Sequence, residues 1–143
     1  MGRHDFDVDP FLAQPLTARL ATAGPRVRPV WYLWEGGQFW VLTGPWTTVP
    51  ADVARDANVA IVVDTCDLGT GRCLQVVAQG QAEVLPFDAG RALRKLERYL
   101  GAVPERWDGR FRRYLSGSVD ARWLRIHPSS LRASDLSFAP SRG

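Results

Sequence analysis

Residues 27–64 read VRPVWYLWEGGQFWVLTGPWTTVPADVARDANVAIVVD, and this stretch decides the fold. It contains three runs rich in β-branched and aromatic residues, at 27–34, 38–42 and 59–63, which are typical of β-strands. Gly36 and Gly37 join the first two runs, and glycine tolerates the positive φ angles that a two-residue hairpin turn requires. The stretch therefore predicts a hairpin followed, after a loop and a short helix, by a third strand.

A loop rich in hydroxyl groups, TGPWTT at residues 43–48, separates the second predicted strand from the third. Pro50 is compatible with the first turn of a helix, which we expect to end near Asp56. Because the first N–H groups of a helix lack partners within it, such a loop can bind an anion, and Thr47 and Thr48 are candidates for phosphate contact. The alternative is a plain N-cap, which the capping preference alone explains.

The composition is that of one ordinary globular domain over residues 1–143, with 45% hydrophobic and 23% charged residues. No apolar run reaches the roughly 18 residues that a membrane helix needs, and the first ten residues are too polar for a signal peptide. A cytoplasmic location is therefore expected, with flexible tails at residues 1–8 and 139–143. Lys95 is the only lysine among the 18 basic residues, a skew typical of a GC-rich genome rather than of nucleic-acid binding.

Cys66 and Cys73 are the only two cysteines, and a hairpin between them could bring their side chains opposite each other. Intracellular redox buffers keep most thiols reduced, so free thiols are the expectation and a disulfide is the alternative. Without further Cys or His nearby the pair is not a zinc site, and we expect no metal site.

Three further strands and three further helices complete the predicted chain. We expect strands at residues 17–23, 74–85 and 121–127, and helices between Asp9 and Pro15, between Asp88 and Gly101, and between Pro104 and Ser116. Alternation within the long strand turns Gln75, Gln79 and Gln81 away from the core, and the segment after Pro128 looks irregular. The predicted fold class is mainly β: a β-barrel of about six antiparallel strands with inserted helices, because closure removes exposed sheet edges.

The last two predicted helices carry more basic than acidic residues. An anion-binding surface and a solvated helix face both explain this pattern, and the solvated face is favoured. A nucleic-acid-binding module would depend on these arginines alone, so we expect neither a nucleic-acid nor a membrane partner.

Four segments are decisive when taken together: FLAQPLTARLAT at 11–22, VRPVWYLWEGGQFWVLTG at 27–44, ARDANVAIVVD at 54–64 and ARWLRIHPSSLRASDLSF at 121–138. Their order resembles that of the pyridoxamine 5′-phosphate oxidase-like split β-barrels, which bind FMN or the deazaflavin coenzyme F-420. The resemblance extends from Asp9 to about Phe138. It implies a homodimer that holds the cofactor at its interface, and such an obligate interface exceeds about 2,000 Å².

By this resemblance the cofactor ring lies along Val30, Trp31 and Tyr32, and the phosphate meets Thr43, Thr47, Thr48 and Val49. The basic residue that clamps the phosphate in the family falls at about Val49, where this chain has valine. Arg55 and Arg28 are the cations that could replace it. A lysine introduced at Val49 is expected to tighten binding about tenfold.

The resemblance implies a flavin- or deazaflavin-dependent oxidoreductase that acts on a small organic substrate. Because the cofactor carries the redox chemistry, no catalytic residue is assigned from the sequence. The expected flat surfaces for a ring are Trp31, Tyr32, Trp40 and Trp46. The alternative is a split-barrel binding protein that has lost its redox cofactor, or that holds haem or another planar ligand, with His4 and His127 as the only imidazoles.

Overall fold

The computed structural model describes residues 4–117 and 119–141. Its strands form one antiparallel sheet of seven strands in the order β2-β1-β5-β6-β7-β4-β3. The strands are β1 (Ala18–Thr22), β2 (Arg26–Val30), β3 (Leu33–Glu35), β4 (Gln38–Thr43), β5 (Asn58–Asp67), β6 (Arg72–Leu85) and β7 (Arg122–Asp135). The fold is mainly β, as predicted. Over the described residues, no helix has both the length and the apolar character needed to span a membrane.

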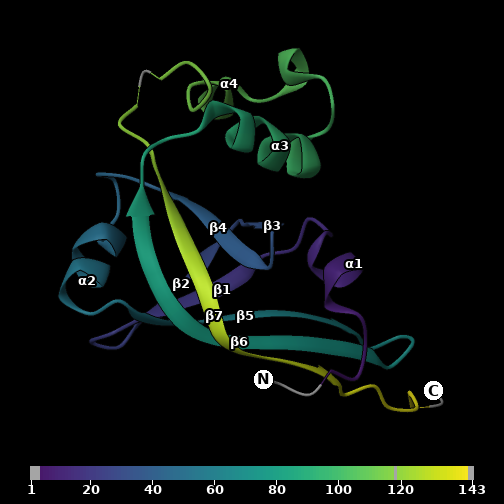
Figure 1. Cartoon of the computed structure of the whole chain (residues 1–143). Helices are drawn as coiled ribbons and strands as arrows, with labels where there is room; N and C mark the ends of the chain where they lie inside the picture. Colours follow the sequence, from purple (N-terminus) through teal and green to yellow (C-terminus); the bar gives the residue numbers. More distant parts are fainter. Residues whose placement is uncertain (1–3, 118, 142–143) are drawn as a thin grey trace.

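The described residues form the helices α1 (Val8–Leu12), α2 (Val49–Arg55), α3 (Ala89–Leu100) and α4 (Gly109–Arg112), and the 3-10 helix η1 (Pro104–Arg106). Figure 1 shows α3 and α4 together at one end of the long strands β6 and β7, with α1 to the right of the barrel and α2 to its left. Helix α1 begins earlier than predicted because Asp7, not Asp9, is its N-cap. The helix predicted between Pro104 and Ser116 was wrong: the extended backbone of Trp107, whose ring is buried, separates η1 from α4.

The sheet closes on itself because its two edge strands are almost adjacent in the sequence. Strand β2 ends at Val30 and β3 begins at Leu33, although these strands lie at opposite ends of the strand order. Three residue steps span at most about 11 Å, so the sheet has to curl until its edges nearly meet, which makes a split β-barrel. The continuous strand predicted over residues 27–34 is therefore broken at Trp31 and Tyr32, and the strands number seven rather than six.

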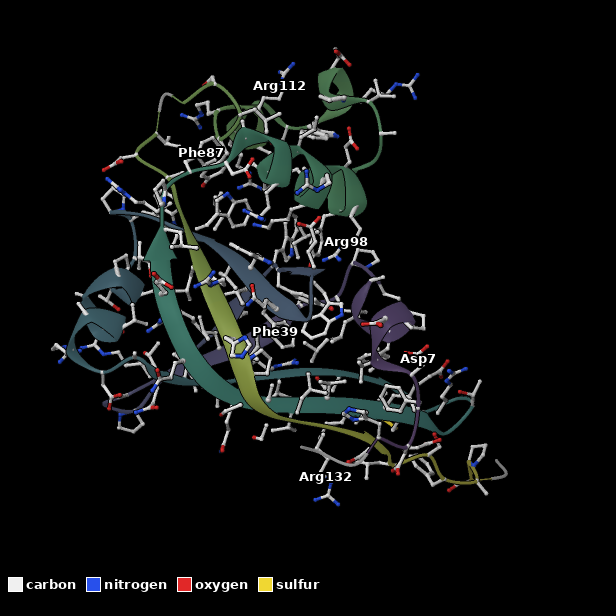
Figure 2. All side chains as sticks on the ribbon, in the orientation of Figure 1. Asp7, Phe39, Phe87, Arg98, Arg112 and Arg132 are labelled. Atoms are coloured by element: carbon white, nitrogen blue, oxygen red, sulfur yellow. A yellow bond between two sulfur atoms is a disulfide. The ribbon has the colours of Figure 1, made fainter. Side chains whose placement is uncertain are left out.

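Side chains of α3, rather than neighbouring strands, stabilise this break. The backbone N–H of Tyr32 donates to the hydroxyl of Tyr99 at 3.1 Å, and the Tyr32 carbonyl accepts from Arg98 Nη2. Arg98 also donates to the carbonyl of Leu12, and Tyr99 donates to that of Leu16 at 2.6 Å. Figure 2 shows Arg98 beneath α3, between this helix and the sheet. Helix α3 thus replaces the ladder hydrogen bonds that the backbone loses where the strand breaks.

Strand β7 continues well beyond Pro128, to Asp135, so the prediction of an irregular tail was wrong. The register with β6 shifts between Gln79 and Gly80, which pairs Gly80 with Pro128 and leaves Ser129 as the extra residue of a bulge. A Cβ atom at Gly80 would lie 2.1 Å from the carbonyl oxygen of His127. Glycine therefore permits the close approach, and the bulge accommodates a proline within the strand.

Two clusters of buried side chains hold the barrel. The larger fills the inside of the sheet from α1 to α2 and includes Leu12, Tyr32, Phe39, Val49 and Ile61. The smaller lies between α3 and the outer face of the sheet and consists of Leu33, Trp40, Ala92 and Trp123. Because successive residues of a strand point to opposite faces, β4 and β7 contribute to both clusters.

Cys66 and Cys73 pair directly across the β5–β6 hairpin and form a disulfide, with their Cα atoms 4.1 Å apart. The expectation of free thiols was therefore wrong. The hairpin register, which the loop residues alone did not specify, places the two side chains on the same face at opposing positions.

Candidate functional site

The two threonines before α2 have different partners. Thr47 Oγ1 accepts a hydrogen bond from the backbone N–H of Val49 at 3.3 Å. Thr48 occupies the N-cap position without a capping side-chain bond, and its hydroxyl instead donates to Asp52 Oδ2 at 3.1 Å. The capping role that we considered for both threonines therefore belongs, in the structure, to Thr47.

Asp52 organises the surroundings of this loop, and its side chain is only 2% exposed. Its carboxylate accepts from Thr22 and Arg28 at 3.1 Å each and from Arg55 at 2.7 Å, while Arg26 Nε lies 4.0 Å away. Burial raises the pKa of Asp52, but the hydrogen bonds from Arg28 and its neighbours outweigh this effect and lower the pKa to about 2. Asp52 is therefore ionised at neutral pH.

Three arginines, Arg26, Arg28 and Arg55, thus converge on a single carboxylate, and we name these four residues the Asp52 cluster. One carboxylate cannot neutralise three guanidinium groups, so the cluster keeps an excess of positive charge. Arg28 Nη1 is buried and has no hydrogen-bond partner among the described residues, while the Arg55 side chain is 65% exposed. Unused donors and excess positive charge beside the Thr47–Thr48 loop fit a phosphate group.

Val49 cannot present a side chain to such a group, because it is 3% exposed and packs in the larger buried cluster. A lysine there would carry its ammonium group into the core. The burial of Val49 argues against the expectation that Val49→Lys tightens phosphate binding, and the affinity of that variant stays a prediction. The cations that we considered as replacements, Arg28 and Arg55, both belong to the Asp52 cluster.

Thr43 and Val30 lie at the ends of β4 and β2. Thr43 is 1% exposed, and its hydroxyl has no hydrogen-bond partner within residues 4–117 and 119–141. Alternation along β4 places it on the inner face with Phe39 and Val41. Val30 is half-buried at the edge of the larger cluster.

Three of the four aromatic residues expected to offer a free flat face are covered by the chain itself. Trp31 stacks on Tyr99 with ring centroids 4.4 Å apart and on Phe111 at 5.5 Å. Tyr32 is fully buried, which raises the pKa of its hydroxyl. Trp40 lies beneath the guanidinium of Arg91, 3.5 Å from the ring centroid. Only Trp46 remains widely accessible, with 49% of its surface exposed.

Two adjoining open grooves, of about 590 and 500 Å³, lie on the outer face of β5, β6 and β7. Gln79 and Gln81 are exposed there, as predicted, whereas Gln75 is half-buried. His127 lines the larger groove, and its Nδ1 lies 3.2 Å from Gln38 Nε2. His4 lies elsewhere and forms an isolated bridge with Ala133. The described residues contain no group of three metal-ligating side chains.

Sequence reasoning missed Asp52, Arg26, Tyr99 and Phe111. Asp52 follows Thr48 by four residues, and this spacing places both on one helix face, so the sequence did contain a signal for their contact. Arg26 and Arg28 alternate on β2, which aims them at one face. No local pattern relates Trp31 to Tyr99 or Phe111, because these contacts depend on how the α3–α4 region folds back.

The curled antiparallel sheet places the chain in the class of split β-barrel proteins. Within this class, the chain belongs to the pyridoxamine 5′-phosphate oxidase family, whose model matches residues 7–135. A comparison with curated proteins gives no match.

Solved structures share this fold. A conserved hypothetical protein of Mycobacterium tuberculosis, Rv2991, is 19% identical and superposes with a TM-score of 0.77 over 100% of this chain and 98% of its own. An F420 reductase is 21% identical, with a TM-score of 0.60 over 86% of this chain and 94% of its own. The FAD binding protein of Mycobacterium smegmatis is 14% identical, with a TM-score of 0.59 over 90% and 93%. At these identities the likeness shows the fold alone.

Proposed function

We propose that the protein is an oxidoreductase that binds FMN or the deazaflavin coenzyme F-420 and acts on a small organic substrate. The observation that carries this proposal is the Asp52 cluster, whose three arginines exceed the single carboxylate that they share. A buried carboxylate that holds guanidinium groups in place lowers the entropy cost of ordering them around an anion. Family membership and the F420 reductase and FAD-binding folds support the same proposal.

The residues that would hold the cofactor lie on two parts of the chain. Arg26, Arg28 and Arg55 would bind its phosphate, with the Thr47 hydroxyl beside them, and the β2–β3 break at Trp31 would receive its ring. The cofactor, when bound, supplies the hydride or electron transfer. The chain would orient it, neutralise its phosphate charge and keep water from the ring, so no acid–base pair of the protein is required.

The most direct experiment titrates FMN and F-420 against purified protein and arginine variants. We expect Arg55→Gln and Arg28→Gln each to weaken binding by about 10- to 100-fold, the range of a charged hydrogen bond. Arg55 is the cleaner position because its exposed side chain contributes little to the core. Arg19→Gln is the matched control, because Arg19 pairs with Asp64 on the same sheet but outside the cluster. Unchanged affinity in both cluster variants would contradict the proposal.

We also propose that two copies of the chain associate through the outer face of β5, β6 and β7. On this face Val62 and Val77 oppose each other, and Arg19 and Arg132 lie opposite them on the neighbouring strands. Apolar side chains framed by charged ones are typical of an interface with a polar rim. Sedimentation equilibrium should give a dimer that Val77→Lys dissociates, while Leu68→Lys, at the exposed hairpin tip, leaves it intact. A wild-type monomer at micromolar concentration would refute the proposed dimer.

A binding protein without redox chemistry is the second candidate. The observation that favours it is the commitment of the Thr22 and Thr48 hydroxyls to Asp52, which leaves neither proton for a phosphate. In this case the protein would bind haem or another planar ligand. An absorption spectrum of the purified protein separates the two candidates, because flavin, deazaflavin and haem absorb differently and respond differently to reduction.

A further inference from the structure

The segment 101–117 joins the proposed ring position to the hydroxyl loop. Phe111 stacks almost parallel on Trp31, with ring centroids 5.5 Å apart and planes 14° apart. Three residues later, Tyr114 meets the edge of Trp46 at 5.6 Å. Trp31 belongs to the β2–β3 break and Trp46 to the loop before α2, so one segment covers a residue of each part of the proposed site. We call residues 101–117 the aromatic lid.

The ends of the aromatic lid are suited to movement. Gly101 has a φ of +100° and Gly117 has a φ of +73°, and a Cβ atom at either would meet nothing within 4 Å. Both glycines therefore occupy open space in backbone conformations that other residues seldom adopt. At Gly117, the end without an anchor like the Trp107–Gly101 hydrogen bond among the described residues, the segment can change direction without displacing packed side chains.

The aromatic lid contacts the rest of the molecule through the rings of Phe111 and Tyr114 and through Leu115, which packs against the smaller buried cluster. Between described residues, its backbone hydrogen bonds to other backbone groups stay local, such as Trp107 to Pro104 and Tyr114 to Phe111, apart from the bond that ends α3 at Gly101. Trp107 is buried, and its indole N–H donates to the Gly101 carbonyl at 2.9 Å, which fixes the first part of the lid next to α3. The part that includes Phe111 and Tyr114 lacks the Trp107 anchor, and we expect this part to move.

We propose that Trp31 is a seat for a planar conjugated ring and that Phe111 occupies this seat until a ligand replaces it. Tyr99 stacks on Trp31 more closely, at 4.4 Å, and its hydroxyl is held by Leu16 and Tyr32, so Tyr99 is the fixed partner and Phe111 the replaceable one. The exposed Arg110 and Arg112 beside Phe111 favour a ring that carries negative charge. The proposal rests on the proposed function for the identity of this ring, but the movement of the lid is independent of it.

The first experiment follows the movement without a ligand. Trypsin should cleave after the lid arginines at least fivefold faster in Phe111→Ala than in the wild type, because opening exposes the backbone that proteases need. Val103→Ala, an exposed position in the same segment without an aromatic contact, should behave as the wild type. Circular dichroism and the Tm check that both variants fold. Equal cleavage of Phe111→Ala and wild type would overturn the lid.

The second experiment measures riboflavin and FMN binding to the same proteins. If Phe111 competes with the ligand ring, Phe111→Ala should bind both about two- to tenfold more tightly, the range expected for one aromatic pair. Weaker binding would make Phe111 a wall of the site and would overturn the proposal. Riboflavin lacks the phosphate, so a gain for riboflavin that Arg55→Gln does not reduce assigns the effect to the ring seat. Absence of binding by every variant would refute the seat and the flavin function, while the cleavage result would still decide the lid.

Discussion

Asp52 and Lys95 are both buried and ionisable, but they lie at two ends of the molecule and differ in how many partners stabilise their charge. Asp52, on α2, accepts hydrogen bonds from two hydroxyls and two guanidinium groups. Lys95, on α3, is 6% exposed beside the smaller buried cluster, and no carboxylate of the described residues pairs with it. Its Nζ lies 5.9 Å from the ring centroid of Trp123, which is a weak cation–π contact.

The contrast is visible in the ionisation of the two groups. Hydrogen bonds hold the pKa of Asp52 at about 2, below its usual value, in spite of burial. Burial, helped by repulsion from Arg98, lowers the pKa of Lys95 to about 8, so nothing compensates the removal of this cation from water. A buried charge with this many hydrogen-bond partners is held in place by the residues around it, whereas a buried charge without partners lowers the stability of the fold. This difference directs the functional proposal to α2, and stability measurements at both ends of the molecule test it.

The largest effect is expected when a second unpaired cation is placed in the core. Val49 is 3% exposed, so Val49→Lys should destabilise the fold by about 4 kcal/mol and lower the Tm by about 12 °C. Ala51→Lys is the matched control, because Ala51 lies on the same helix and is exposed. It should shift the Tm by no more than about 2 °C. A Val49→Lys protein as stable as Ala51→Lys would mean that this region tolerates cations as the α3 region does.

The next largest effect should come from removing the charge at the centre of the Asp52 cluster. Asp52→Asn keeps the shape but leaves three guanidinium groups without a counter-charge, and we expect the Tm to fall by about 9 °C at pH 7. Asp64→Asn, which breaks the exposed pair with Arg19, should lower it by no more than about 2 °C. Equal losses in the two variants, measured by differential scanning calorimetry, would show that the cluster is an ordinary surface network.

The same carboxylate gives the cluster a defined pH dependence. Because the folded pKa lies below the unfolded value of about 3.8, the stability that Asp52 contributes is fully present above about pH 4. It is lost as the pH falls from about 4 to about 2. Wild type should therefore lose more stability over this window than Asp52→Asn does.

Local patterns located most of the strands and the start of α3, but not the break at Trp31 and Tyr32 or the extension of β7 beyond Pro128. Alternation identified β6 over almost its full length, Gly36 and Gly37 identified the β3–β4 turn, and Asp88 identified the start of α3. Local patterns could not predict the contacts that form across the closed barrel. The break at Tyr32 follows from the position of β3 at the far edge of the sheet, which depends on the pairing of all seven strands. The inward orientation of Val49 follows in the same way from the packing of α2 against the barrel interior.

The candidate site likewise contains residues that local patterns identify and residues that depend on contacts across the barrel. Thr47 and Thr48 were recognisable because a helix start has a local signature, and Arg28 and Arg55 were recognisable as nearby cations. The carboxylate that holds these arginines was not, because Asp52 contacts Thr22 and Arg28 from another part of the chain. The sequence pattern also did not predict the burial of Lys95, because it placed this residue of α3 on a solvated basic face. Long-range packing, rather than composition, decides whether a charged residue is paired.

The smallest effect, and the only stabilising one, is expected at Lys95. Lys95→Met keeps the length of the side chain and removes a cation without a counter-charge, so we expect the Tm to rise by about 6 °C at pH 7. In the wild type, the unfolded chain retains the Lys95 proton up to about pH 10.5, whereas the folded chain releases it near pH 8. Stability should therefore rise with pH between these values, by about 3 kcal/mol.

Chemical denaturation at pH 7, 8, 9 and 10 tests this prediction through the difference between wild type and variant. Lys95→Met should be more stable at pH 7, and its advantage should shrink steadily as the wild type loses the Lys95 proton. Arg94→Met, on the same helix, is the matched control: it breaks the exposed pair with Glu35 and leaves the rise with pH unchanged. A constant difference in unfolding free energy between wild type and Lys95→Met across this pH range would show that the Lys95 ammonium group reaches water. Lys95 would then not be a buried charge, and it would no longer contrast with Asp52.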